Sequence, residues 1–177
     1  MATWIAFLRA INLGARRKFP KDDIVAAVVR TGGRDVATHI NTGNVRFDHE
    51  MTQRSEVEAL LEEEFLRDRG FEVPTICLSP AELIVVAEEA KTFGEGHDGL
   101  HYISLLKDEP SVELIEALAA RTGGEEVARL GRRAVHLLIG ANYHGARLTN
   151  AAVERHLGVA TSRNLNVVTT LAAKWGA

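Results

Sequence analysis

Several features that would assign a protein to a class are scarce or missing in this sequence. Its 177 residues contain one cysteine, Cys77, so no disulfide can form within the chain and no metal site can use several thiolates. No apolar run approaches the roughly 20 residues that cross a bilayer. The apolar stretch 1–10 lacks the basic region and the long apolar region of a secretory signal. We therefore expect a soluble, cytoplasmic protein without a membrane partner.

Neither positive nor negative charge is in large excess, because the net charge is −3 at pH 7. This value excludes the strongly basic footprint of a duplex-DNA binder. The charges are unevenly spread, with a basic cluster at 15–21 and an acidic run at 61–65. The simplest interpretation of both segments is a solvated surface.

Residues that would bind a metal or a cofactor do not form a motif. His97 and His101 are four positions apart, but Gly99 between them argues against the helix that such spacing needs. No glycine-rich nucleotide-binding motif and no nucleophile motif occurs. Cys77 lies in a predicted strand without a neighbouring cation, which indicates a buried, inert thiol. We expect no metal and no cofactor.

Hydrophobic residues make up 46% of the chain, and their spacing alternates between the periods of strands and helices. In the first half this spacing predicts strands at 3–10, 35–40, 44–48 and 71–78 and helices at 20–32 and 55–70. Ser55 and Glu58 have the spacing of a capping box at the start of the second helix. Pro74 indicates that the last strand lies at a sheet edge. The order is β-α-β-β-α-β.

The second half repeats most of this order. The pattern predicts helices at 79–92, 111–122, 149–158 and 163–175 and strands at 100–106, 125–130 and 133–139, and Gly123 suits a helix exit. This is β-α-β-β-α, with one additional helix before it and one after it. Both halves thus follow the split β-α-β order of ferredoxin-like folds. We predict an α+β protein of two ferredoxin-like subdomains, 1–78 and 79–177, packed together.

Four polar motifs lie within this pattern. They read FLRAINLGARRK (7–18), INTGNVRF (40–47), ARLTN (146–150) and TSRNLNVVTTL (161–171). Their order and spacing over almost the whole chain resemble the family known as domain of unknown function 1697 (DUF1697). The resemblance implies an α+β fold of two ferredoxin-like subdomains and assigns no activity.

The chain departs from the family pattern at a few positions. Ala10 and Ala15 stand where glycine is usual, Ala146 and Arg147 where Ser-Lys is usual, and Leu165 and Thr170 where tryptophan and lysine are usual. Arginine keeps the cation at position 147, whereas threonine loses one at position 170. A site that required a lysine at position 170 would lack that group here.

The polar residues of the motifs are cations and neutral amides, without a carboxylate, cysteine or histidine. Arginine and lysine bind phosphate or carboxylate, and asparagine offers both donors and acceptors. Such a set favours binding of an anionic ligand, such as a nucleotide or single-stranded nucleic acid, over acid–base catalysis. The candidate ligand-binding residues are Arg9, Asn12, Lys18, Asn41, Asn44, Arg147, Asn150, Arg163 and Asn164. The sequence identifies no catalytic residue, and whether the protein is an enzyme stays open.

Each motif also has a purely structural interpretation. Thr149 has the position of a helix N-cap, and Ser162 or Asn164 could cap the last helix. Gly43 with its asparagine neighbours suits a hairpin turn. Arg9 is harder to explain in this way, because it follows an apolar strand where a charge needs a partner or access to water.

Two physical objections stand against one anion site. Asp22 and Asp23 would lie in the first turn of the helix after the basic loop, where their charge competes with an anion. We also expect the first and third strands to be parallel neighbours, which would put loop 9–18 and hairpin 41–44 at opposite ends of the sheet.

Three functions therefore remain open. The protein binds a nucleotide or single-stranded nucleic acid, or it is an enzyme that acts on a small anionic metabolite, or it is a structural or protein-interaction module. The first accounts best for the cations and amides, although no exposed aromatic pair for base stacking is evident. The oligomeric state is not indicated.

Overall fold

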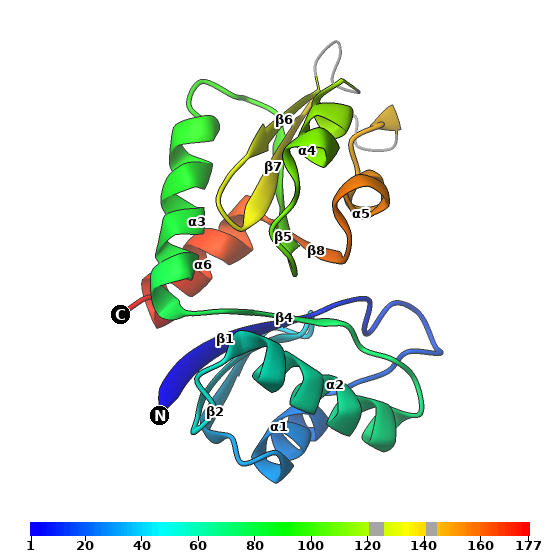
Figure 1. Cartoon of the computed structure of the whole chain (residues 1–177), viewed down its shortest axis with the longest axis vertical. Helices are drawn as coiled ribbons and strands as arrows, with labels where there is room; N and C mark the ends of the chain where they lie inside the picture. Colours follow the sequence, from blue (N-terminus) through cyan, green and yellow to red (C-terminus); the bar gives the residue numbers. More distant parts are fainter. Residues whose placement is uncertain (121–125, 141–144) are drawn as a thin grey trace. The chain divides into compact units, whose positions relative to one another are not determined.

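The computed structural model of the protein describes residues 1–120, 126–140 and 145–177. The chain divides into two compact units, Met1–Ala81 and Glu82–Ala177 (Figure 1). Each unit contains a four-stranded sheet with helices on it. The predicted α+β class with two ferredoxin-like arrangements is confirmed. Among the described residues, no helix is both long enough and apolar enough to span a membrane.

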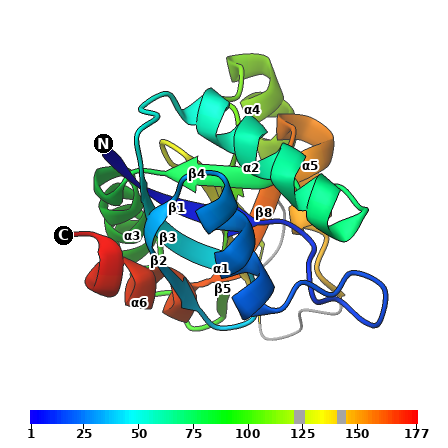
Figure 2. The same cartoon turned by 90° about the horizontal axis from the view of Figure 1, so that it is seen from below.

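The first unit has the order β-α-β-β-α-β. Its elements are β1 (Ala2–Leu8), α1 (Lys21–Arg30), β2 (Arg34–His39), β3 (Asn44–His49), α2 (Arg54–Arg69) and β4 (Thr75–Leu78). The strands lie in the order β2-β3-β1-β4, which is the ferredoxin-like order and confirms β4 as an edge. Helices α1 and α2 pack on one face of this sheet (Figure 1 and Figure 2). The core between these helices and the sheet includes Trp4, Ala6, Phe47 and Phe65.

The first and third strands are antiparallel, so the expectation of parallel neighbours was wrong. Phe7, near the end of β1, lies opposite Asn44, the first residue of β3. The crossover through α1 makes β1 and β2 parallel, and the tight hairpin then reverses the chain. Strand β3, which lies between β2 and β1, therefore runs against both. The loop after β1 and the tip of the β2–β3 hairpin consequently meet at the same end of the sheet.

The second unit repeats this topology after one additional helix. Its elements are α3 (Pro80–Phe93), β5 (Leu100–Leu106), α4 (Val112–Ala119), β6 (Val127–Leu130), β7 (Ala134–Ile139), α5 (Asn150–Leu157), β8 (Ala160–Asn164) and α6 (Leu165–Trp175). The strand order is β6-β7-β5-β8, and every pairing is antiparallel. The predicted helix exit at Gly123 lies outside the described residues.

Strand β8 completes the second ferredoxin-like unit and was not predicted. Its residues, ATSRN, are short and mostly polar, and α6 follows without a linking residue. Polar residues are nevertheless tolerated because β8 is an edge strand that pairs only with β5. The predicted helix over 163–175 therefore begins two residues later, at Leu165.

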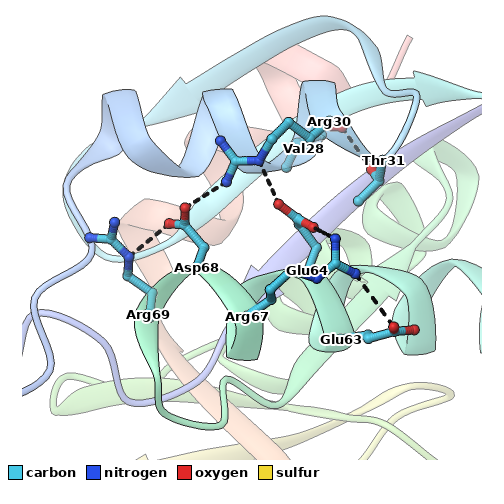
Figure 3. Close-up of polar contacts among 8 residues, drawn as sticks. All are labelled: Val28, Arg30, Thr31, Glu63, Glu64, Arg67, Asp68 and Arg69. Atoms are coloured by element: carbon cyan, nitrogen blue, oxygen red, sulfur yellow. Dashed lines mark hydrogen bonds and ion pairs between the residues drawn. The ribbon is translucent and has the colours of Figure 1, made fainter.

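Arginine and carboxylate side chains join α1 to α2. Figure 3 shows Arg30 of α1 paired with Glu64 and Asp68 of α2. Glu64 also pairs with Arg67 at 2.8 Å, and Asp68 pairs with Arg69 at 2.8 Å. The hydrogen bond to Glu64 is the main cause that raises the pKa of Arg30. Because Glu64 is buried, it needs these cations to offset its desolvation.

Two further glutamates of α2 bind the outer edge of the sheet. Glu62 accepts a hydrogen bond from the Thr75 amide, and Glu58 accepts one from the Cys77 amide, both at 2.8 Å. These amides belong to edge strand β4, whose outward N–H groups lack a neighbouring strand. The acidic run is thus not simply a solvated surface. The predicted capping box is also wrong, because α2 starts at Arg54 without a side-chain cap.

The hairpin tip allows no side chain at Gly43. Its φ is +76°, and a Cβ there would lie 2.7 Å from Leu8 Cβ and 2.9 Å from Ile11 Cδ1. We expect Gly43→Ala to lower the free energy of unfolding by about 3 kcal/mol, from left-handed strain together with overpacking. Urea denaturation followed by circular dichroism measures this loss.

Gly70→Ala is the matched control. Gly70 has a φ of +73° at the end of α2, but a Cβ there meets nothing within 4 Å. Only the left-handed strain remains, so we expect a loss of about 1 kcal/mol. Equal losses in the two variants would show that the hairpin tip does not pack tightly on Leu8.

Candidate functional site

The two units connect their first strand to their first helix by loops of very different length. Each unit has two equivalent backbone hydrogen bonds at the end of its first strand. They are Leu8 N to Gly43 O (2.8 Å) and Arg9 N to Pro74 O (2.9 Å) in the first unit, and Leu106 N to Arg133 O (2.9 Å) and Lys107 N to Val159 O (3.0 Å) in the second. Yet residues 9–20 join β1 to α1, whereas residues 107–111 are enough to join β5 to α4. The fold itself does not need the longer loop.

Asn12 holds this longer loop in place. Its side-chain amide donates to Phe19 O at 3.0 Å and to Asn41 O at 2.8 Å, and its Oδ1 accepts from Phe19 N at 2.8 Å. Its own backbone is left-handed, with a φ of 56°, a conformation that asparagine tolerates better than most residues. Asn12 therefore ties the loop both to itself and to the hairpin.

Arg17 fixes the other side of the loop. Its guanidinium donates to Ala10 O and to Glu72 O, both at 2.6 Å, and stacks over the Phe71 ring with Cζ 4.7 Å from the centroid. Ala10 also has a positive φ, 55°, where the family pattern usually has glycine. The loop is therefore an ordered, locally strained structure, and strain of this kind is common at functional sites.

The hairpin residue Asn44 has a structural role. It is fully buried, and its amide donates to His39 O at 3.1 Å and to Thr42 Oγ1 at 2.9 Å. Asn41, by contrast, is exposed and contacts the loop through its main-chain carbonyl. Its side chain thus remains available at the surface. Ile40 beside it has a φ of 50°, which is unusual for a β-branched residue.

A groove of about 580 Å³ lies between the loop, the hairpin tip and the start of α1. It is lined by Asn12, Gly14, Lys18, Pro20, Lys21, Asp22 and Asn41. Lys18 and Lys21 are exposed, and within the described residues their ammonium groups make no hydrogen bond or ion pair. The structure therefore brings three of the predicted site residues, Asn12, Lys18 and Asn41, to one groove.

The groove also contains the N-terminal end of α1. The N-cap residue is Pro20, which provides no side-chain cap, and the first intrahelical bond runs from Ile24 N to Pro20 O at 3.0 Å. Amides before Ile24 have no intrahelical acceptor, so this end favours negative charge. Of the two aspartates in the first turn, Asp23 is paired with Arg69 at 3.0 Å. Only Asp22 lines the groove.

The predicted residues of the second unit lie on its own elements. Arg147 is exposed, and its amide donates to the Glu126 carboxylate at 2.9 Å. Thr149 caps α5 by accepting from Ala152 N, as predicted, and the Asn150 amide donates to Ala160 O at 3.0 Å. These contacts fix the start of α5 to β8.

Arg163 and Asn164 end strand β8. Asn164 accepts from Val167 N at 2.9 Å and is the N-cap of α6, whereas Ser162 lies within the strand. Arg163 is buried, which lowers the pKa of its guanidinium to about 10. It donates to Thr161 Oγ1 and to Ser162 O. Arg9, in the first unit, is half-buried beside β4.

Lys21 is the groove residue that the motifs did not identify. It lies outside the four motifs, and the pattern treated it as part of a solvated basic cluster. The sequence feature that could have identified Lys21 is Pro20, which precedes it at the start of the predicted helix. Proline provides no side-chain cap, so the N-terminal amides of this helix stay open to a ligand.

The ordinary catalytic groups do not meet in this groove. Its lining contains one carboxylate and neither histidine nor cysteine. Cys77 is buried. Across residues 1–120, 126–140 and 145–177, no cluster of three histidine, cysteine or acidic side chains could hold a metal ion. The arrangement suits binding of an anion.

In a comparison with known families, residues 1–136 match the family described as protein of unknown function (DUF1697). The chain belongs to the DUF1697 family. The matched segment includes the motifs at 7–18 and 40–47, and the other two motifs follow it. A search of curated proteins gives no match.

A solved structure has the same fold as this DUF1697 protein. It is that of the conserved bacterial protein SP0830 from Streptococcus pneumoniae, with a TM-score of 0.77 and 17% sequence identity. The similarity covers 100% of this chain and 99% of that one. At this identity the comparison establishes the fold alone.

The two asparagines of the groove should differ in their effect on stability. We expect Asn12→Ala to lower the free energy of unfolding by about 2 kcal/mol, because three hydrogen bonds are lost. Asn41→Ala should change it by less than about 0.5 kcal/mol, since its contact uses the main chain. Thermal unfolding of both variants tests this difference. A loss for Asn41→Ala as large as that for Asn12→Ala would contradict the assignment.

Proposed function

We propose that the groove beside α1 binds an anionic ligand with a phosphate group, such as a nucleotide or single-stranded nucleic acid. The observation that carries this proposal is the pair Lys18 and Lys21, which line a groove of about 580 Å³ and have no ion pair within the described residues. Ammonium groups and open helix amides are the groups that proteins use to hold phosphate.

The loop supports the proposal because the fold does not require it. The second unit makes the corresponding connection with residues 107–111 and the same backbone hydrogen bonds. The longer loop is held in a strained conformation by Asn12 and Arg17. Its ordered shape serves to place Lys18 beside the helix start.

The earlier objection from the two aspartates is weaker in this geometry. Asp23 is neutralised by Arg69, so two lysines face one unpaired carboxylate, that of Asp22. The exposed side chain of Asn41 adds a neutral polar group to the lining. Without a histidine, a cysteine or a second carboxylate in the lining, the proposal is one of binding and includes no reaction. We also propose that the protein acts in the cytoplasm, where free nucleotides are abundant and its single thiol stays reduced.

The test is binding of fluorescently labelled AMP and of labelled 12-nucleotide single-stranded RNA and DNA, at 50 and 200 mM salt. We expect salt-sensitive binding by the wild type of at least one of these probes. Lys18→Ala and Lys21→Ala should each weaken it about tenfold, as expected for the loss of a charged hydrogen bond. Asp22→Asn should strengthen it, because a competing negative charge is removed.

Lys91→Ala is the matched control. Lys91 is an exposed lysine on α3 in the other unit, so its replacement removes one positive charge without changing the groove. Circular dichroism checks the fold of each variant. Absence of binding by the folded wild type, or an equal loss for Lys91→Ala, would refute a phosphate site in this groove.

A further inference from the structure

A buried pair of histidines lies on one face of the second unit's sheet, outside the groove described above. His101 of β5 is 7% exposed and His136 of β7 is fully buried. His101 Nε2 lies 3.2 Å from His136 Nδ1, and the ring centroids are 5.4 Å apart. A contact between two ring nitrogens is a hydrogen bond only when one of them carries a proton and the other does not.

Side chains of helix α3 contact this pair. Glu89 Oε2 lies 3.4 Å from His136 Nε2, and its Oε1 accepts from Arg132 N at 2.9 Å. The Phe93 ring meets the His136 ring edge-on at 5.1 Å. A Cβ on Gly94 would lie 2.9 Å from His101 Nδ1. The histidines are therefore part of the surface that the C-terminal half of α3 contacts.

These contacts allow the protons of the pair to be assigned. Because the ionised Glu89 carboxylate can only accept, we assign the proton of His136 to Nε2, so that its Nδ1 accepts from His101 Nε2–H. His101 Nδ1 is then unprotonated, and it is buried without a hydrogen-bond partner in the described residues. A proton added to His136 Nδ1 would break the hydrogen bond between the rings. A proton added to His101 Nδ1 would bury an N–H group that has no acceptor among the described residues.

The surrounding charges do not favour a protonated pair. His97 lies after α3, and two arginines share the sheet face, Arg129 opposite His136 and Arg163 opposite Ile103. Helix α6, which also contacts β5, carries only Lys174 as a charged residue. Glu89 is the carboxylate that contacts the pair, and Glu95 and Asp98 lie in the segment between α3 and β5. Burial, then His136 and His97, lower the pKa of His101 to about 4, and burial lowers that of His136 to about 4.

We propose that His101 and His136 form an acid-sensitive latch, which holds α3 on the sheet while the pair is neutral and releases it when the pair takes up protons. In the released state both rings reach water and regain an ordinary pKa near 6.5. Between pH 6.5 and about 4 the released state therefore binds more protons than the closed state. The closed state is fully favoured above pH 6.5 and loses that advantage as the pH falls.

The experiment is amide hydrogen exchange of the full chain at pH 7 and pH 5, corrected for intrinsic exchange rates. In the wild type, protection of α3 amides should fall by about tenfold for each histidine, while α2 amides change little. His136→Gln keeps a donor and an acceptor and removes one titrating group, so it should reduce the fall. The double variant with His101→Gln should abolish it.

A second readout does not depend on any variant. In two-dimensional NMR of the wild-type imidazoles, His101 and His136 should keep their neutral shifts from pH 7.5 down to 5.5. Ordinary titration of both rings near pH 6.5 would overturn the latch. So would unchanged α3 protection at pH 5, or an equal loss over the whole second unit.

Discussion

The antiparallel pairing of β1 with β3 is the constraint on which the candidate site depends. It puts the last residue of β1 beside the hairpin tip, where Leu8 N bonds to Gly43 O. A loop that leaves β1 must then start next to the hairpin, and Asn12 spans the two with one side chain. With parallel strands the same motifs would be separated by the length of the sheet.

The second unit shows how short the connection between the first strand and the first helix can be in this topology. The pairing of β5 with β7 and the backbone bonds of Leu106 and Lys107 reproduce those of the first unit. There a short loop completes the connection, and the buried guanidinium of Arg133 binds Leu106 O and Lys107 O. The two units share one topology, and the second forms it with the short connection 107–111. The additional length of loop 9–20 in the first unit is therefore not explained by the stability of the fold.

The sequence predicted most of the fold because hydrophobic spacing reports which face of an element is buried. It failed where the determining partner is distant in the chain. Strand β8 is mostly polar and forms because it pairs with β5. Glu58 accepts a hydrogen bond from the Cys77 amide instead of capping its own helix. The residues of the groove were anticipated in part: Asn12, Lys18 and Asn41 lie in the motifs, but Lys21 joins the groove only through the folded position of α1.

The polar residues of one motif therefore have two different roles, which only the geometry separates. Asn44 is buried and uses both amide protons to close the hairpin, and Asn12 uses its amide to hold the loop. Their hydrogen-bonding capacity is consumed within the protein. Lys18 and Lys21 sit on that scaffold with their charges uncompensated in the described structure. Because an uncompensated cation adds little to stability at a surface, the fold alone does not explain these two lysines, and the proposed anionic ligand would.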